Sequence, residues 1–205
     1  MKLKTQQHTQ SYNAEIVAGS LLIPESRIIA QLLLDETDED TFQRKIMVEN
    51  VLQKRSPAAA KRQAKLIQNR LELMTPELWE IIANNSLDIA IHAILAASIK
   101  HSHLLGDFMD RVIREHWRTF KRQISTTDWN DYWAMCMQAD PEINEWSEKT
   151  KAKLRQVVFR ILAEAKYFDS SRFLNLRHVN VVPEVRTYLI NNNEDYVLRC
   201  MEVTQ

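Results

Sequence analysis

The chain has 205 residues with equal numbers of acidic and basic side chains, so its formal net charge is zero. The length fits one domain or two small ones. With 45% apolar and 26% charged residues, the composition is typical of a globular protein rather than a disordered one. Only two glycines occur, although phosphate-binding loops need several of them. The composition therefore excludes a P-loop and a dinucleotide fingerprint.

The spacing of the cysteines and the length of the apolar runs indicate the cellular compartment of the protein. Cys136 and Cys200 are far apart, so neither a disulfide framework nor a zinc site is expected. The longest apolar run, Ile89–Ile99, has about 11 residues, whereas a membrane span needs about 20. The first residues also lack the apolar run of a signal peptide. We therefore expect a cytoplasmic protein with no membrane partner.

Helical spacing dominates the first half of the chain. Residues 1–12 are polar and predict a flexible tail, and apolar periodicity then predicts helices at 21–34 and 40–52. A hydroxyl residue followed by proline or an acid is typical of a helix start, as at Ser56-Pro57 and Thr75-Pro76. Such signals and the periodicity predict helices at 56–73, 75–83, 86–100, 103–120, 127–140 and 147–167.

The pattern changes after Phe168. Arg172–Val182 alternates loosely and is the only material for strands, and short helices are predicted at 183–190 and 194–201. Helix, hairpin and helix are compatible with a winged-helix-like unit, although the hairpin lacks an Asn-Gly type of turn.

The predicted fold class is mainly α, a multi-helix globular bundle with this helix-hairpin-helix unit near the C-terminus. The predicted organisation is a flexible tail (1–12), an N-terminal helical region (13–145) and a C-terminal helix-hairpin-helix region (146–205).

A search for chemistry finds no catalytic pattern. His101 and His103 are two residues apart and point to different faces of a helix, so they do not form a metal pair. His116 falls on an apolar face, and Cys136 has an apolar setting that favours a buried thiol. Neither a nucleophile elbow nor a paired-carboxylate pattern occurs. We therefore expect no enzyme, no metal and no cofactor.

The most informative feature is a run of six cations without an acid between positions 54 and 70. On a helix of about 100° per residue, its central cations share one arc opposite an apolar face. The helix N-terminus adds backbone N–H groups that attract phosphate. Clustered cations bind nucleic acid whatever the net charge is. The predicted DNA-contacting residues here are Lys54, Arg55, Ser56, Lys61, Arg62, Lys65 and Arg70.

Two further basic stripes occur. Lys149, Lys153 and Arg160 lie opposite an apolar face of the helix at 147–167. Either this stripe or the C-terminal helix-hairpin-helix is expected to form a second DNA contact. Arginines within Arg111–Arg122 share their arc with acidic residues, so internal ion pairs explain that stripe better. A solvated helix surface is the alternative interpretation for all three stripes.

Several segments together resemble a known family. They are AGSLLIPESR (18–27), NVLQKRSP (50–57), KHSHLLGDF (100–108), WSE (146–148) with LRQVVFRILAE (154–164), and EDYVLRCM (194–201). The combination resembles the BrxA family over nearly the whole chain from about Tyr12.

The resemblance implies a small helical accessory component of the bacteriophage exclusion (BREX) system. Such systems include a DNA methyltransferase and an ATPase, and the family has no established active-site signature. We therefore expect a non-enzymatic subunit that binds double-stranded DNA through its basic helix faces, with those other BREX subunits as partners. The alternative is an adaptor whose cationic faces dock on an acidic partner subunit without direct DNA binding.

Overall fold

Four of the α-helices in the described chain begin at a capping side chain. The computed structural model describes residues 12–204. Side-chain oxygens cap α2 (Glu39–Met47), α3 (Pro57–Leu71) and α9 (Glu148–Glu164), and a capping box begins α8 (Thr126–Ala139). The predicted mainly helical bundle is confirmed.

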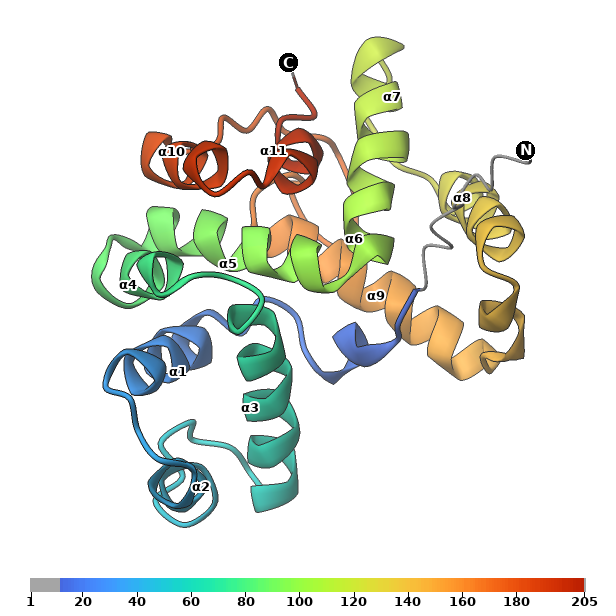
Figure 1. Ribbon diagram of the computed structural model, residues 1–205. Coiled ribbons are helices and arrows are strands. Elements are labelled where there is room, and N and C mark those ends of the chain that lie inside the picture. Colours follow the sequence, from blue (N-terminus) through green and yellow to red (C-terminus); the bar gives the residue numbers. More distant parts are fainter. Residues whose placement is uncertain (1–11, 205) are drawn as a thin grey trace, which may run out of the picture.

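The other elements complete a bundle around a long central helix (Figure 1). One continuous helical rod runs from residue 103 to 118, because a π-helical turn joins two α-helical pieces. The elements not yet named are η1 (Glu15–Ala18), α1 (Ile23–Leu34), α4 (Pro76–Asn84), α5 (Leu87–His101), α6 (His103–Asp107), η2 (Phe108–Ile113), α7 (Arg114–Arg118), η3 (Pro141–Glu145), α10 (Pro183–Asn191) and α11 (Asp195–Met201).

The helix α5 occupies the middle of the core. Every residue from Ala90 to Ile99 is buried, because α1, α3 and α4 pack on one side of this helix and α10 and α11 on another (Figure 1). Burial on all sides explains the longest apolar run of the sequence. No helix within residues 12–204 is both long enough and apolar enough to cross a membrane.

The start of the described chain is firmly held. Tyr12 was assigned to the flexible tail, but it is buried. Its backbone N–H donates to Asp140 at 2.8 Å and its hydroxyl donates to Asp107 at 2.8 Å. Residues 1–11 of the predicted tail lie outside the described residues, and the predicted division at residue 145 stays a prediction.

The predicted hairpin at 172–182 is wrong. Residues 166–182 form an irregular loop with two isolated bridges, one between Phe168 and Leu176 and one from Asn175 to Gln123, and no strand forms in the described part of the chain. The left-handed backbone of Leu174 (φ 55°) interrupts the extended path. The buried residues Leu176, Val179 and Val181 are also not evenly two apart, so the segment does not present one apolar face. A helix-loop-helix arrangement therefore replaces the winged-helix-like unit.

A buried histidine attaches this loop to the core and makes stability depend on pH. The backbone N–H of Val182 donates to His92 Nδ1 at 3.1 Å. Burial lowers the pKa of His92, and Asp88 offsets this only in part. The unfolded chain therefore binds the proton at a higher pH than the folded chain does, so stability is lost as the pH falls below about 6.5.

We expect His92→Gln to reduce this acid sensitivity. Between about pH 7.5 and 5.5, the wild type should lose about 1 kcal/mol more unfolding free energy than the variant does. Urea titrations at both pH values measure the difference. His101, which burial shifts in the same direction, is present in both proteins and cancels. Equal losses in the two proteins would contradict the assignment.

Candidate nucleic-acid interface

The basic face of α3 forms as its periodicity predicts. Lys61, Arg62 and Lys65 are exposed, while the apolar residues of the opposite face are buried. Ser56 caps the helix by accepting a hydrogen bond from the backbone N–H of Ala59 at 3.3 Å, and Arg55 is exposed beside it. None of these four cations forms an ion pair with a carboxylate among residues 12–204.

The basic face of α9 is also exposed. Lys149, Lys153 and Arg160 point away from a buried apolar face. Lys153 Nζ donates to Gln156 at 3.1 Å. Arg160 Nε pairs with Glu164 at 3.0 Å, although the arginine side chain is 66% exposed. Lys149 and Lys153 therefore form no ion pair with a carboxylate among residues 12–204, whereas Arg160 does.

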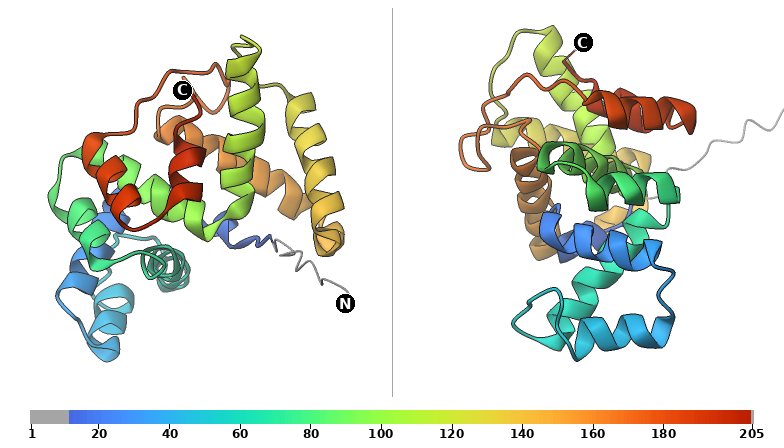
Figure 2. Two further views of the ribbon diagram at one scale, coloured as in Figure 1. Left: turned by 45° about the horizontal axis from the view of Figure 1, so that its top comes forward. Right: turned by 90° about the vertical axis from the view of Figure 1, so that its left-hand side faces the viewer.

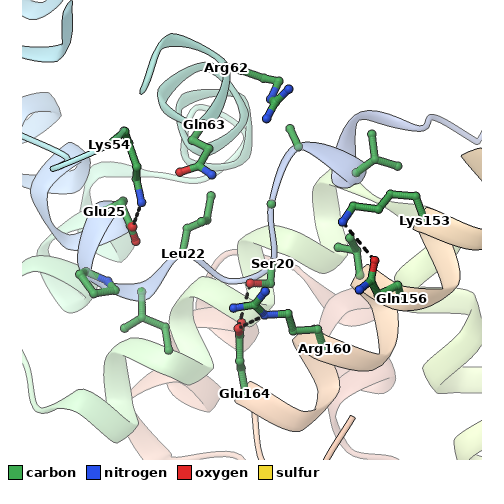
Figure 3. Close-up of a pocket in the computed structure, with 16 residues that line it drawn as sticks. Ser20, Leu22, Glu25, Lys54, Arg62, Gln63, Lys153, Gln156, Arg160 and Glu164 are labelled. Atoms are coloured by element: carbon green, nitrogen blue, oxygen red, sulfur yellow. Dashed lines mark hydrogen bonds and ion pairs between the residues drawn. The ribbon is translucent and has the colours of Figure 1, made fainter. Parts of the chain in front are cut away.

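The fold brings the two basic faces to a single groove. The segment from η1 into α1, residues 17–25, forms its floor between α3 and α9 (Figure 3). Lys54 and Arg62 line one side, and Lys153 and Arg160 line the other. The groove has a volume of about 560 Å³. Cations that lie about a hundred residues apart in the sequence therefore face the same space.

Hydrogen bonds from two helices hold the floor in place. Glu164 on α9 accepts from Ser20 Oγ and from the backbone N–H of Leu21, both at 2.9 Å. Arg70 on α3 donates to the carbonyl oxygens of Ser20 at 2.7 Å and Gly19 at 3.3 Å. The floor is thus tied to both walls of the groove.

The assignment of Arg70 to DNA contact is wrong. Its side chain is among the largest that are fully buried, with 1% of the residue exposed. Burial lowers its pKa to about 10, against the opposing effect of Glu164, so it stays charged at neutral pH. Its position on the helix explains the burial, because Arg70 lies one turn after Ile67 and directly before Leu71, both of which are buried. Arg70 supports the groove from below instead of lining it.

Lys54 also differs from its expected state. The side chain is only 18% exposed and pairs with Glu25, which is itself 14% exposed. Both residues line the groove (Figure 3), so this end of it is electrically neutral. The unpaired positive charge is concentrated toward Arg62 and Lys153.

A second hollow of about 670 Å³ continues the basic surface along α3. Lys61, Arg62 and Lys65 line it, and Arg62 borders both hollows. Glu15 at its edge is held by Asn69 and His101, each at 3.0 Å. The hydrogen bond from Asn69 is the main reason why the pKa of Glu15 lies below its ordinary value. The positive surface therefore runs along α3 and across to α9 with few free carboxylates.

The other candidate groups have structural surroundings. His116 is buried with its Nδ1 at 3.0 Å from the carbonyl oxygen of Val112, as its apolar face predicts. Burial raises the pKa of the Cys136 thiol and raises that of Cys200 to about 12. Among residues 12–204, no group of three or more His, Cys, Asp or Glu side chains could hold a metal ion.

The arginine stripe at 111–122 divides into two halves. Arg111 lies 3.6 Å from Asp107, and Arg114 lies 3.0 Å from Asp110, as the interpretation of internal ion pairs requires. Arg118 and Arg122 are exposed and pair with no carboxylate of the described chain. Arg122 instead lies over the ring of Trp117 at 5.3 Å.

Comparisons with known proteins agree on one family. The BrxA family model matches residues 10–193. The BREX protein BrxA of Paramagnetospirillum magneticum is 48% identical over 94% of this chain and 97% of its own length. The BREX protein BrxA of Escherichia coli O9:H4 is 31% identical over 94% of this chain and 91% of its own.

A solved structure supports the same relationship. The crystal structure of an uncharacterized protein from Magnetospirillum magneticum has a TM-score of 0.87 and 46% sequence identity. It covers 95% of this chain and 100% of its own. The family model and the two curated relatives show that this chain belongs to the BrxA family of BREX proteins.

Proposed function

We propose that this protein is a non-enzymatic DNA-binding subunit of a BREX phage-defence system, acting in the cytoplasm. The observation that carries the proposal is the convergence of the α3 and α9 basic faces on one groove. Phosphodiesters bind where cations cluster, and release of counterions from DNA supplies the free energy. The floor held by Arg70 and Glu164 keeps the two faces at a fixed separation, so little ordering is needed on binding.

The size of the groove suggests how a duplex would lie. A space of about 560 Å³ takes part of one sugar–phosphate backbone rather than a whole duplex. In this proposal, one DNA strand follows the groove between Arg62 and Lys153, while Lys61 and Lys65 contact phosphates along the adjoining hollow. The faces of the molecule away from this surface are left for the methyltransferase, the ATPase or other BREX subunits.

Reversing the α3 charges tests the proposal. We expect Lys61→Glu/Arg62→Glu/Lys65→Glu to weaken duplex binding more than about tenfold. With about five phosphates neutralised, log affinity should fall against log salt with a slope of about −4.5 in the wild type and about −2 in the variant. Fluorescence anisotropy over a salt series measures both. The thermal midpoint should be unchanged, because all three side chains are exposed.

A matched pair separates this site from general charge effects. Arg62→Glu changes a groove residue, and Arg186→Glu makes the same exchange on α10, where the half-exposed arginine pairs with Glu202, so the thermal midpoint of this control is measured as well. Only the first should weaken duplex binding. Unchanged duplex affinity in the triple variant would overturn the proposal. If a copurifying BREX subunit were lost instead, the adaptor function would be indicated. A cleavage assay on phage DNA with added divalent metal tests whether the protein is an enzyme. We expect no cleavage.

A further inference from the structure

Two loops that are distant in sequence are joined at the far end of α7. The backbone N–H of Leu176 donates to the carbonyl of Arg122 at 2.8 Å, and that of Ile124 donates to Leu174 at 3.1 Å. The side chain of Gln123 donates to the carbonyl of Phe173 at 2.8 Å. We call residues 118–124 and 172–178 together the two-loop tip. These bonds make it a fixed surface at the projecting end of α7 (Figure 2).

Two aromatic rings of the tip are held out of the core. Phe120 is 83% exposed and Phe173 is 56% exposed. Phe120 also has a left-handed backbone, with φ of 58°, which is unfavourable for a residue with a Cβ atom. Exposed apolar rings and a strained backbone both reduce stability. Such a residue is expected where function rather than folding determines its place.

The two loops that carry these rings also carry exposed cations. The guanidinium of Arg172 lies over the ring of Phe173 at 5.4 Å. Two nearby carboxylates form hydrogen bonds of their own, since Asp128 caps α8 through Ser125 and Asp169 accepts from Asn175, and their charges act on Lys121 and Arg177. Glu115 and Asp131 line a hollow together with Lys121. Within residues 12–204 the cations of the tip form no ion pair with a carboxylate. The exposed cations are Arg118, Lys121, Arg122, Arg172 and Arg177.

We propose that the two-loop tip binds single-stranded nucleic acid, with unpaired bases stacking on Phe120 and Phe173 and the surrounding arginines contacting phosphates. Aromatic rings beside cations are the usual means of binding bases without sequence preference. An acidic peptide would use the positive charge but would leave the rings exposed. The bases of an intact duplex already stack on one another, so only unpaired or extruded bases present a free face.

The two-loop tip and the proposed duplex-binding surface are separate, so this inference is independent of the proposed duplex binding. In Figure 1 the free end of α7 projects at the top of the molecule, whereas α3 lies in its lower half. No tip residue lines the groove or the hollow beside it. The two surfaces can therefore be altered separately.

Two oligomers of equal length test the inference: single-stranded DNA and an abasic chain with the same phosphates but no bases. We expect the wild-type protein to bind the DNA about tenfold or more tightly than the abasic chain in anisotropy titrations. Phe120→Ala/Phe173→Ala should weaken binding of the single-stranded DNA but not of the abasic chain, so that the two affinities become similar. Arg118→Gln/Arg122→Gln/Arg172→Gln should weaken binding of both oligomers. Since these side chains are exposed, the variants should fold normally.

Controls separate the sites. Val48→Ala alters another exposed apolar residue, 77% accessible at the end of α2, and should keep the preference for bases. The α3 triple charge reversal should weaken duplex binding and also keep that preference. Equal wild-type affinities for the two oligomers would overturn the inference, as would an unchanged preference in the double Phe variant. Tighter binding of polyglutamate than of DNA at the tip would also overturn it and indicate protein docking.

Discussion

Replacing Arg70 with alanine is expected to lower the free energy of unfolding by about 3 kcal/mol. The variant leaves the carbonyl oxygens of Ser20 and Gly19 without their donors in a buried place. It also removes a positive charge that acts on Glu164 and opens a cavity under the groove. Urea unfolding at neutral pH measures the loss.

Local loosening should accompany the loss of Arg70. The backbone N–H of Leu21 is held by Glu164, but the carbonyls beside it lose their contact with α3. We expect amides at 19–21 to exchange with deuterium faster in Arg70→Ala than global unfolding explains. Arg62→Ala, an exposed change on the same helix, is the matched control and should stay within about 0.5 kcal/mol of the wild type. A similarly small effect of Arg70→Ala would contradict the anchoring role.

The basic face of α3 could be predicted because one helix determines it. Ser56 and Pro57 fix where the helix begins, and a period of 3.6 residues then decides which cations share an arc. The prediction for Arg70 is wrong because a charged residue next to the apolar arc is buried only when a distant part of the chain supplies hydrogen-bond acceptors for it. That partner is the chain at Gly19–Ser20, fifty positions away. Periodicity within one helix contains no information about such a partner.

The groove itself could not be predicted for the same reason. Its walls are two helices whose distance depends on the non-periodic segment 17–25. The quoted motif AGSLLIPESR contains all of that segment except Val17, and Ser20 and Glu25 within it line the groove. A motif that contains polar residues but lacks helical periodicity can therefore indicate a segment that forms hydrogen bonds with residues distant in the sequence. The loop pairing at the tip, through Gln123 and Asn175, had no comparable signal.

The packing around Gly106 explains why this position, one of the two glycines of the chain, has no side chain. A Cβ atom added there would lie 2.4 Å from the hydroxyl oxygen of Tyr196 and 3.0 Å from Ile99 Cγ2. That hydroxyl donates to Asp107 at 2.9 Å, and the buried Asp107 also accepts from Tyr12. The missing side chain therefore lets α11 approach the rod that begins with α6, and Asp107 then joins both ends of the described chain.

We expect Gly106→Ala to lower the free energy of unfolding by about 2 kcal/mol, because the new methyl group pushes Tyr196 away from Asp107. Tyr196→Phe alone should lower it by about 1 kcal/mol through loss of the same hydrogen bond. In the double variant the clashing oxygen is absent and the bond is already lost. The combined loss should therefore fall short of the sum by about 1 kcal/mol. A urea double-mutant cycle measures this coupling, and additive losses would show that Gly106 is not needed for the approach of Tyr196.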